Sequence, residues 1–146
     1  MLRSIGAVVG GYVVMFVIVF ATFSGLYLAI GADGAFKPGT YDVSTMWIVV
    51  SIVLSTLAAL AGGWVCELIS GGGKAALALA ILVAILGLVA AIPPLTAPPS
   101  NEVRTADVPN MEAMMKAKAP AWIALLNPCI GAVGALAGAK LRRGGG

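Results

Sequence analysis

The side chains that could do chemistry are few in this 146-residue chain, and three of them lie inside long apolar stretches. Ser24, Ser51 and Asn127 each lie about six or seven residues from the end of their stretch that faces one common side of the membrane. With a helical rise of ~1.5 Å per residue, the three side chains therefore lie at one depth. Ser55 lies one helical turn beyond Ser51, and Pro128 frees a backbone carbonyl one turn earlier from its helical bond. Lipid cannot satisfy such polar groups, so they must bond to protein or face water.

Two interpretations of this polar level remain open. It is either an interhelical hydrogen-bond cluster that fixes the packing, with each bond contributing about 0.6–2 kcal/mol, or the floor of an outward-facing cavity for a small polar ligand or ion. Intramembrane Ser and Asn indicate function less strongly than intramembrane charges do.

The sequence contains few of the residues that catalytic sites commonly use. The chain has no histidine, and its two cysteines, Cys66 and Cys129, fall at different depths and should not pair. No nucleophile lies beside a plausible base, and the glycine-rich segments at 31–34 and 70–74 lack the spacing of a phosphate loop. We therefore expect no enzyme, no metal and no cofactor.

One acid, Glu67, falls near the end of an apolar stretch. We expect its carboxylate to extend toward the surface and meet Arg3, Lys74 or Lys140.

The amino-acid composition predicts the helices that carry these polar side chains. The residues are 60% hydrophobic and 10% charged, against about 45–50% and about 25% in soluble domains. Four charge-free stretches each reach the roughly 20 residues that a membrane-crossing helix needs. The first is too long for a signal-peptide core, which has about 7–15 residues. We predict an all-α integral membrane protein, a four-helix bundle forming one transmembrane domain over 1–146. The predicted spans are 4–30, 44–69, 74–93 and 120–141, and Ser44 is the expected N-cap of the second. A proline-rich loop at 94–119 carries a short helix at 110–118, capped by Asn110.

Charge distribution predicts the orientation. Basic residues on short segments near helix ends favour the cytoplasmic side. They place both termini in the cytoplasm and the 94–119 loop outside, in what we expect to be a bacterial inner membrane. The net charge of +3 follows from this layout and requires no nucleic-acid partner.

Small residues recur on one face of each predicted span. Such faces let helix backbones approach closely in lipid. The glycines that we expect to pack are Gly6, Gly10, Gly62, Gly87, Gly131, Gly134 and Gly138. Outside the spans, Met111, Met114 and Met115 share a face of the short helix, which predicts an apolar patch that docks on the membrane or on a partner.

These features favour a non-catalytic membrane protein. We expect an accessory or scaffold subunit of a membrane complex, or a homo-oligomer that packs through its small-residue faces, with the lipid bilayer and other membrane subunits or a second copy as partners. The alternative is a small transporter or channel whose outward-facing polar cavity surrounds Ser24, Ser51 and Asn127.

Overall fold

Four long apolar helices and one short helix make up the described part of the chain. The computed structural model describes residues 2–96, 102–104 and 108–145. The helices are α1 (Leu2–Ala35), α2 (Thr45–Ser70), α3 (Ala75–Thr96), α4 (Asn110–Lys116) and α5 (Ala121–Gly144). All except α4 are long and apolar enough to cross a membrane. The prediction of an all-helical protein with four apolar membrane-length helices is confirmed. Residues 97–101 and 105–107 of the predicted loop lie outside the described residues.

The helix ends follow local backbone chemistry. The Ser44 side chain accepts the Trp47 N–H at 3.1 Å, which caps the start of α2 as predicted. Gly71 ends α2 in a left-handed conformation with φ 69°. The first helix differs from its prediction, because it extends past Gly31, where the backbone breaks at φ 69°, to Ala35.

The short helix α4 also begins differently from the prediction. Pro109, not Asn110, occupies the capping position, and Asn110 is the first helical residue. The cause is that the Asn110 side chain is used elsewhere: its Nδ2 donates to the hydroxyl of Ser24 at 3.0 Å.

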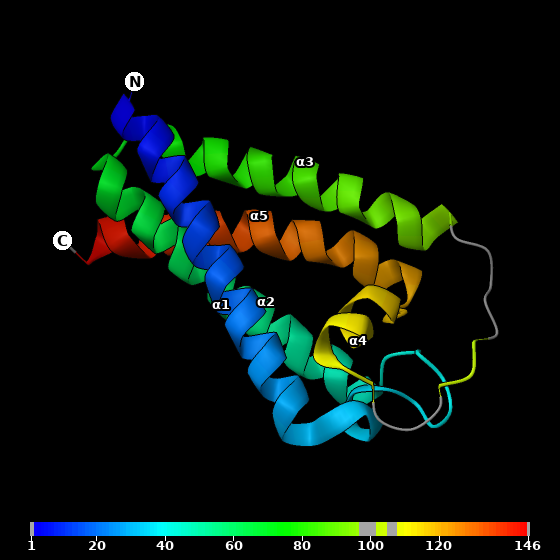
Figure 1. The fold of residues 1–146 in the computed structure, drawn as a ribbon. Helices are drawn as coiled ribbons and strands as arrows, with labels where there is room; N and C mark the ends of the chain where they lie inside the picture. Colours follow the sequence, from blue (N-terminus) through cyan, green and yellow to red (C-terminus); the bar gives the residue numbers. More distant parts are fainter. Residues whose placement is uncertain (1, 97–101, 105–107, 146) are drawn as a thin grey trace.

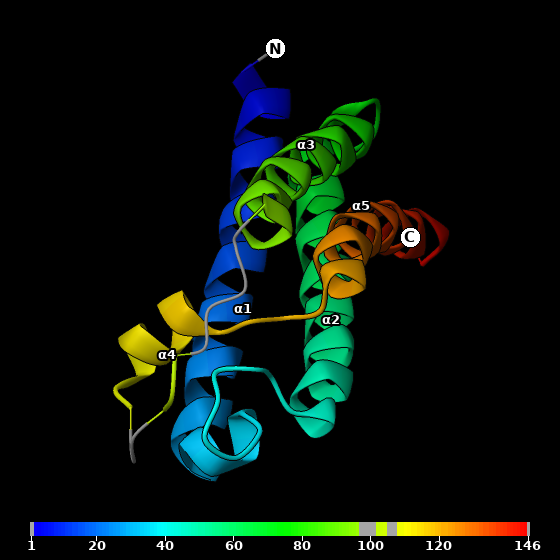
Figure 2. The ribbon, with the colours of Figure 1, turned by 90° about the vertical axis from the view of Figure 1, so that its right-hand side faces the viewer.

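The long helices form two pairs, α1 with α2 and α3 with α5, and the pairs are joined through α2 and α5. Both chain ends lie at one end of the molecule, which we call the terminal end, and the α1–α2 connection lies at the other, the loop end (Figure 1). The pairs converge toward the terminal end and diverge toward the loop end (Figure 1). In the view turned by 90°, α4 lies beside α1 and away from α5 (Figure 2).

Glycines seal the two pairs together near the terminal end. A Cβ at Gly138 would lie 2.0 Å from the Leu60 carbonyl oxygen, and one at Gly134 would lie 2.5 Å from the Ala59 Cβ. Gly63 is equally tight, since its Cβ would lie 1.9 Å from the Ala135 carbonyl oxygen. Contacts this close leave no room for a side chain, so α2 and α5 approach backbone to backbone.

The other predicted glycines are placed less uniformly. Gly62 faces Gly11 and Met15 of α1, while Gly87 and Gly131 form contacts within the α3–α5 pair, with Pro128 and Val83. Gly10 lies close to the Ile69 side chain. Gly6 is exposed, and a Cβ added there would meet no atom within 4 Å.

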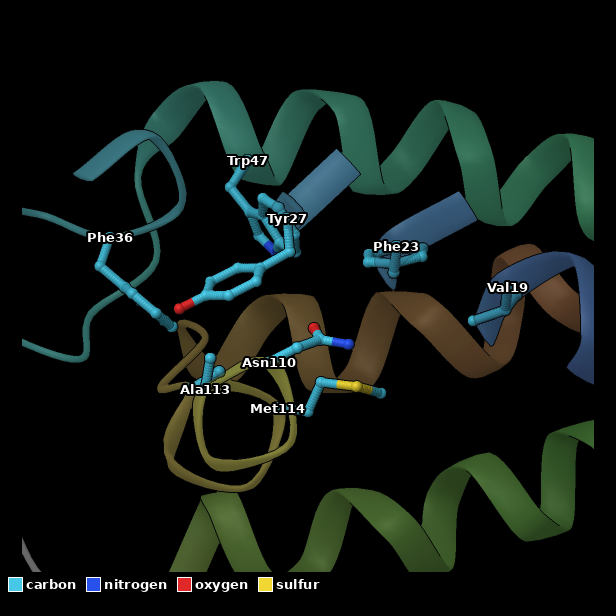
Figure 3. Close-up of a pocket in the computed structure, with 9 residues that line it drawn as sticks. Val19, Phe23, Tyr27, Phe36, Trp47, Asn110, Ala113 and Met114 are labelled. Carbon is cyan, nitrogen blue, oxygen red and sulfur yellow. The ribbon is translucent and has the colours of Figure 1, made fainter. Parts of the chain in front are cut away.

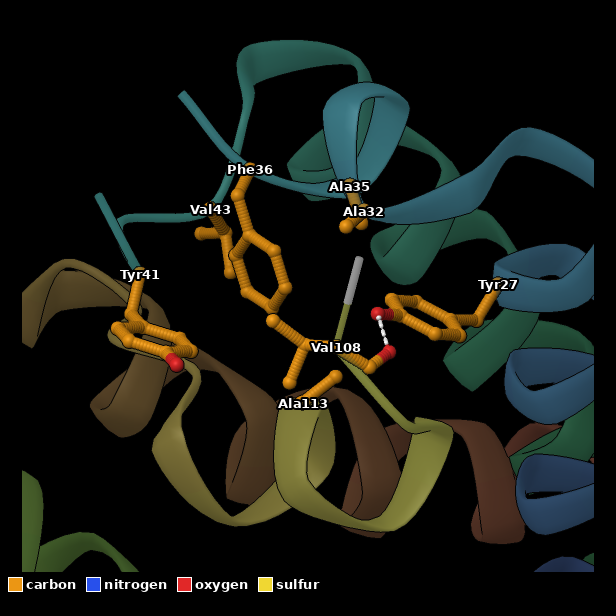
Figure 4. Close-up of a cluster of buried hydrophobic side chains, with 8 residues drawn as sticks. All are labelled: Tyr27, Ala32, Ala35, Phe36, Tyr41, Val43, Val108 and Ala113. Carbon is orange, nitrogen blue, oxygen red and sulfur yellow. Dashed lines mark hydrogen bonds between the residues drawn. The ribbon is translucent and has the colours of Figure 1, made fainter. Parts of the chain in front are cut away.

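A small hydrophobic core stabilises the loop end (Figure 4). Its buried residues come from the end of α1, the α1–α2 connection and the segment around α4; they are Tyr27, Ala32, Ala35, Phe36, Tyr41, Val43, Val108 and Ala113. We call this unit the loop-end cap. Backbone bonds cross it: Val43 N–H donates to Lys118 O at 3.1 Å, and Lys118 N–H donates to Tyr41 O at 2.9 Å. The chain leading into α5 is therefore fixed to the α1–α2 connection.

Candidate functional site: the wedge between the helix pairs

The candidate site is the space between the two helix pairs on the loop-end side of the contact between Gly134 and Ala59. We call this space the wedge. It is bounded by α2 on one side and by α5 on the other (Figure 1).

The three predicted polar residues do not bond to one another. The Ser24 hydroxyl accepts from Asn110 on α4. The Ser51 hydroxyl donates to the carbonyl of Trp47 in its own helix at 2.5 Å. Asn127 is exposed, and within the described part of the chain its side chain has no hydrogen-bond partner. The three polar side chains therefore lie in three different environments: one bonds to α4, one bonds within its own helix, and one is exposed.

The exposure of Asn127 follows from the divergence of the pairs. At 100° per residue, Asn127 lies on the same face of α5 as Gly134 and Gly138. Those two glycines are buried against α2. Two turns toward the loop end, α5 has left α2 but still packs on α3, where Pro128 is buried against Gly87. The Asn127 amide thus faces the wedge.

The face of α2 that carries Ser51 and Ser55 is turned toward α1. At 100° per residue the two serines share this face with Gly62, which packs against Gly11 and Met15 of α1. Gly62 is buried, whereas Ser51 and Ser55, nearer the loop end, are half-buried. The two hydroxyls therefore lie on the α1 side of α2, and of the three predicted polar residues Asn127 is the one that faces the wedge.

A largely apolar pocket of about 210 Å³ lies where the loop-end parts of α1 and α2 meet α4 (Figure 3). Aromatic side chains form much of its wall. The rings of Phe23 and Trp47 meet edge to face with centroids 5.7 Å apart, and Tyr27 meets Trp47 at 6.4 Å. The Tyr27 hydroxyl is already engaged, because it donates to Val108 O at 2.5 Å.

Asn110 supplies a polar atom at this pocket. Its Nδ2 is bonded to Ser24, while its Oδ1 is buried and has no hydrogen-bond partner within the described residues. A buried amide oxygen left without a donor costs about 1–3 kcal/mol. Sequence reasoning missed this residue as a site residue, because it interpreted Asn110 only as a cap.

The methionines of α4 are divided between two environments. Met114 lines the pocket, and Met111 and Met115 are exposed. The predicted docking patch is thus in part a wall of this pocket.

Ion pairs hold the loop-end cap. Arg104, which is buried, donates through Nη2 to Asp33 Oδ1 at 2.6 Å, and its guanidinium lies 5.9 Å from the Phe36 ring centroid. On α4, Lys116 pairs with Glu112 at 3.1 Å. The hydrogen bond to Glu112, supported by the charge of Glu102, raises the pKa of Lys116.

At the terminal end, Glu67 is buried and bonds to Arg143, not to Arg3, Lys74 or Lys140 as expected. The physical reason is the length of α5. The prediction ended this helix at residue 141, but it continues to Gly144 and carries Arg143 back over the end of α2. Arg3 instead donates to the Ile69 carbonyl at 2.7 Å.

The part of the chain that the structure describes contains no cluster of side chains suited to binding a metal ion. There, no three Cys, Asp or Glu side chains gather closely enough to hold an ion. Both cysteines are free thiols; Cys66 is buried and Cys129 is exposed.

Comparison with known proteins yields no match to a family model, to a curated protein or to a solved structure. The function must therefore be inferred from the wedge itself.

Proposed function

We propose that this chain is a non-catalytic membrane subunit that associates with another transmembrane segment, from a partner protein or from a second copy, through the wedge side of α5. The observation that carries the proposal is the exposed Asn127 amide, which lies about 9 Å along the helix from its first residue. Burying an amide in an apolar medium without a hydrogen bond costs about 2–7 kcal/mol. A polar group from a neighbouring helix would remove that cost.

Assembly of the purified protein tests this proposal. The tagged full chain is extracted in gentle detergent, its mass is measured by light scattering, and co-purifying proteins are identified by mass spectrometry. Asn127→Leu is expected to release the partner or to shift an oligomer to monomer, with unchanged helix content. Val133→Ala, at another exposed position of α5, serves as the matched control and should assemble normally. A wild-type chain recovered as a lone monomer, or an Asn127→Leu chain that assembles fully, would refute the proposal.

A second candidate function is transport through an outward-facing polar cavity. It is favoured by the exposed Asn127 amide, which would meet water if the wedge is open at the loop end. Thiol accessibility separates the two candidates. Asn127→Cys is introduced into a Cys129→Ser background, with the buried Cys66 retained. Labelling of this position by a charged, impermeant maleimide from the loop-end side would indicate water in the wedge and support transport. Protection supports a wedge filled by protein or lipid.

We further propose that the terminal end faces the cytoplasm of a bacterial inner membrane. The support is the set of basic residues on short segments there, which are Arg3, Lys74, Lys140, Arg142 and Arg143. A C-terminal fluorescent-protein fusion should fluoresce, and an alkaline phosphatase fusion at the same position should be inactive. The reverse result would invert the topology.

A further inference from the structure

The pocket beneath α4 combines apolar walls with one buried acceptor that has no donor. Apolar burial alone would be satisfied by a lipid chain, but the Oδ1 atom of Asn110 would remain without a hydrogen bond. In the structure Nδ2 donates to Ser24 and Oδ1 is the end of the amide that is left free. The missing chemical group is therefore a hydrogen-bond donor on an otherwise apolar molecule.

Size and wall chemistry narrow the ligand further. The cavity measures about 210 Å³, and an engineered apolar cavity of about 150 Å³ accepts benzene. Phe23, Tyr27 and Trp47 present ring edges and faces (Figure 3), and aromatic pairs in these arrangements add to the free energy of burial. A single ring with a short apolar substituent fits this volume and these walls.

Position favours a ligand that enters from the membrane. Trp47 is the third residue of α2, at the loop end of the span, a depth at which amphipathic aromatic groups concentrate.

We propose that this pocket binds a membrane-soluble phenol, with its ring among Phe23, Tyr27 and Trp47 and its hydroxyl donating to Oδ1 of Asn110. This site is independent of the Asn127 surface, so a monomeric chain would bind the ligand equally well.

Paired probes test the role of the donor. The full chain is placed in nanodiscs and titrated with 4-propylphenol or with 4-propylanisole, in which a methyl group replaces the hydroxyl hydrogen. Trp64→Phe and Trp122→Phe leave Trp47 as the fluorescent reporter, and empty nanodiscs correct for partitioning. The phenol is expected to quench Trp47 saturably and to bind about tenfold more tightly than the anisole, as one well-placed hydrogen bond allows.

Variants test the residues. Asn110→Leu should reduce the phenol affinity to that of the anisole. Ser24→Ala removes only the Nδ2 partner and should change the phenol affinity less than threefold. Ala113→Leu fills the pocket without altering either polar group and should abolish saturable quenching by both probes. Circular dichroism checks that each variant retains its helices.

Two results would overturn the proposal. Equal affinities for the phenol and the anisole would show that Asn110 presents no acceptor to the pocket. Unchanged phenol binding by folded Ala113→Leu would place the ligand elsewhere.

Discussion

The Glu67 carboxylate and the Arg143 guanidinium form a two-point pair, with Nε to Oε1 at 2.7 Å and Nη2 to Oε2 at 2.8 Å. Glu67 is buried, whereas Arg143 is half-exposed and also donates to the Gly73 carbonyl at 3.1 Å. The pair therefore joins the ends of α2 and α5 to the turn that precedes α3.

Loss of Arg143 should weaken this end of the molecule. Arg143→Ala leaves the Glu67 carboxylate buried without its partner, so we expect a loss of about 1–3 kcal/mol in the free energy of unfolding. Lys140→Ala, at an exposed position on the same helix end, should cost less than about 0.5 kcal/mol. Unfolding in increasing mole fractions of SDS measures both. Equal effects of the two substitutions would show that the ion pair contributes nothing.

The backbone contact between α2 and α5 should not tolerate a methyl group. Gly63→Ala and Gly138→Ala each place a Cβ about 2 Å from a backbone oxygen of the facing helix, so we expect a loss of about 1–3 kcal/mol or more. Gly6→Ala is the matched control, because its Cβ meets no atom within 4 Å; it should be neutral or stabilise by up to about 1 kcal/mol. Thermal unfolding in detergent measures the relative stabilities of these variants. A Gly63→Ala protein as stable as Gly6→Ala would contradict the close contact between α2 and α5.

The Tyr27 hydroxyl should stabilise the loop-end cap locally. Tyr27→Phe removes the donor to the Val108 carbonyl, which we expect to cost about 1–2 kcal/mol. Hydrogen exchange should speed up in α4 and in the 36–44 connection while α3 stays protected. Tyr12→Phe, on the half-buried part of α1, should leave both regions unchanged. Uniform acceleration across the protein would instead indicate a global effect.

The start of α2 should depend on Ser44. Its hydroxyl accepts the Trp47 N–H at 3.1 Å and donates to Gly34 O at 2.7 Å. Ser44→Ala removes both bonds, for an expected loss of about 1–2 kcal/mol, and Ser44→Asp should restore the cap in part. Ser4→Ala, at an exposed site, is the control in the same SDS titration. Full stability of Ser44→Ala would rule out the capping role.

Features that depend on one segment of the chain could be predicted from the sequence, whereas features that depend on how the helices pack could not. Apolar length and the capping preference of serine are local properties, and they placed the spans and the start of α2. A helical wheel of α5 places Asn127 beside Gly134 and Gly138. It held no information on where α5 departs from α2, and that departure alone decides that the glycines are buried and the amide is exposed.

The packing glycines illustrate the same limit. Among the described glycines, Gly63 makes the tightest approach, and Gly11 packs against the backbone of Gly62, yet the predicted set contains only their neighbours, Gly62 and Gly10. The adjacent pairs Gly10-Gly11 and Gly62-Gly63 were a usable signal, because two successive glycines free two neighbouring faces of one helix. Asn110 carried no such signal, since its role depends on Ser24, 86 positions away in sequence.

The bridge across the loop-end cap is made by main-chain atoms of Tyr41, Val43 and Lys118. These bonds do not depend on the side chains, so substitutions at position 118 can leave the divergence of the two helix pairs unchanged. Proline is the exception at Val43 and Lys118, because it has no N–H to give. A saturation library at these two positions, sorted for folded protein, should therefore lose proline more strongly than any other residue, a signature of architecture held by the polypeptide itself.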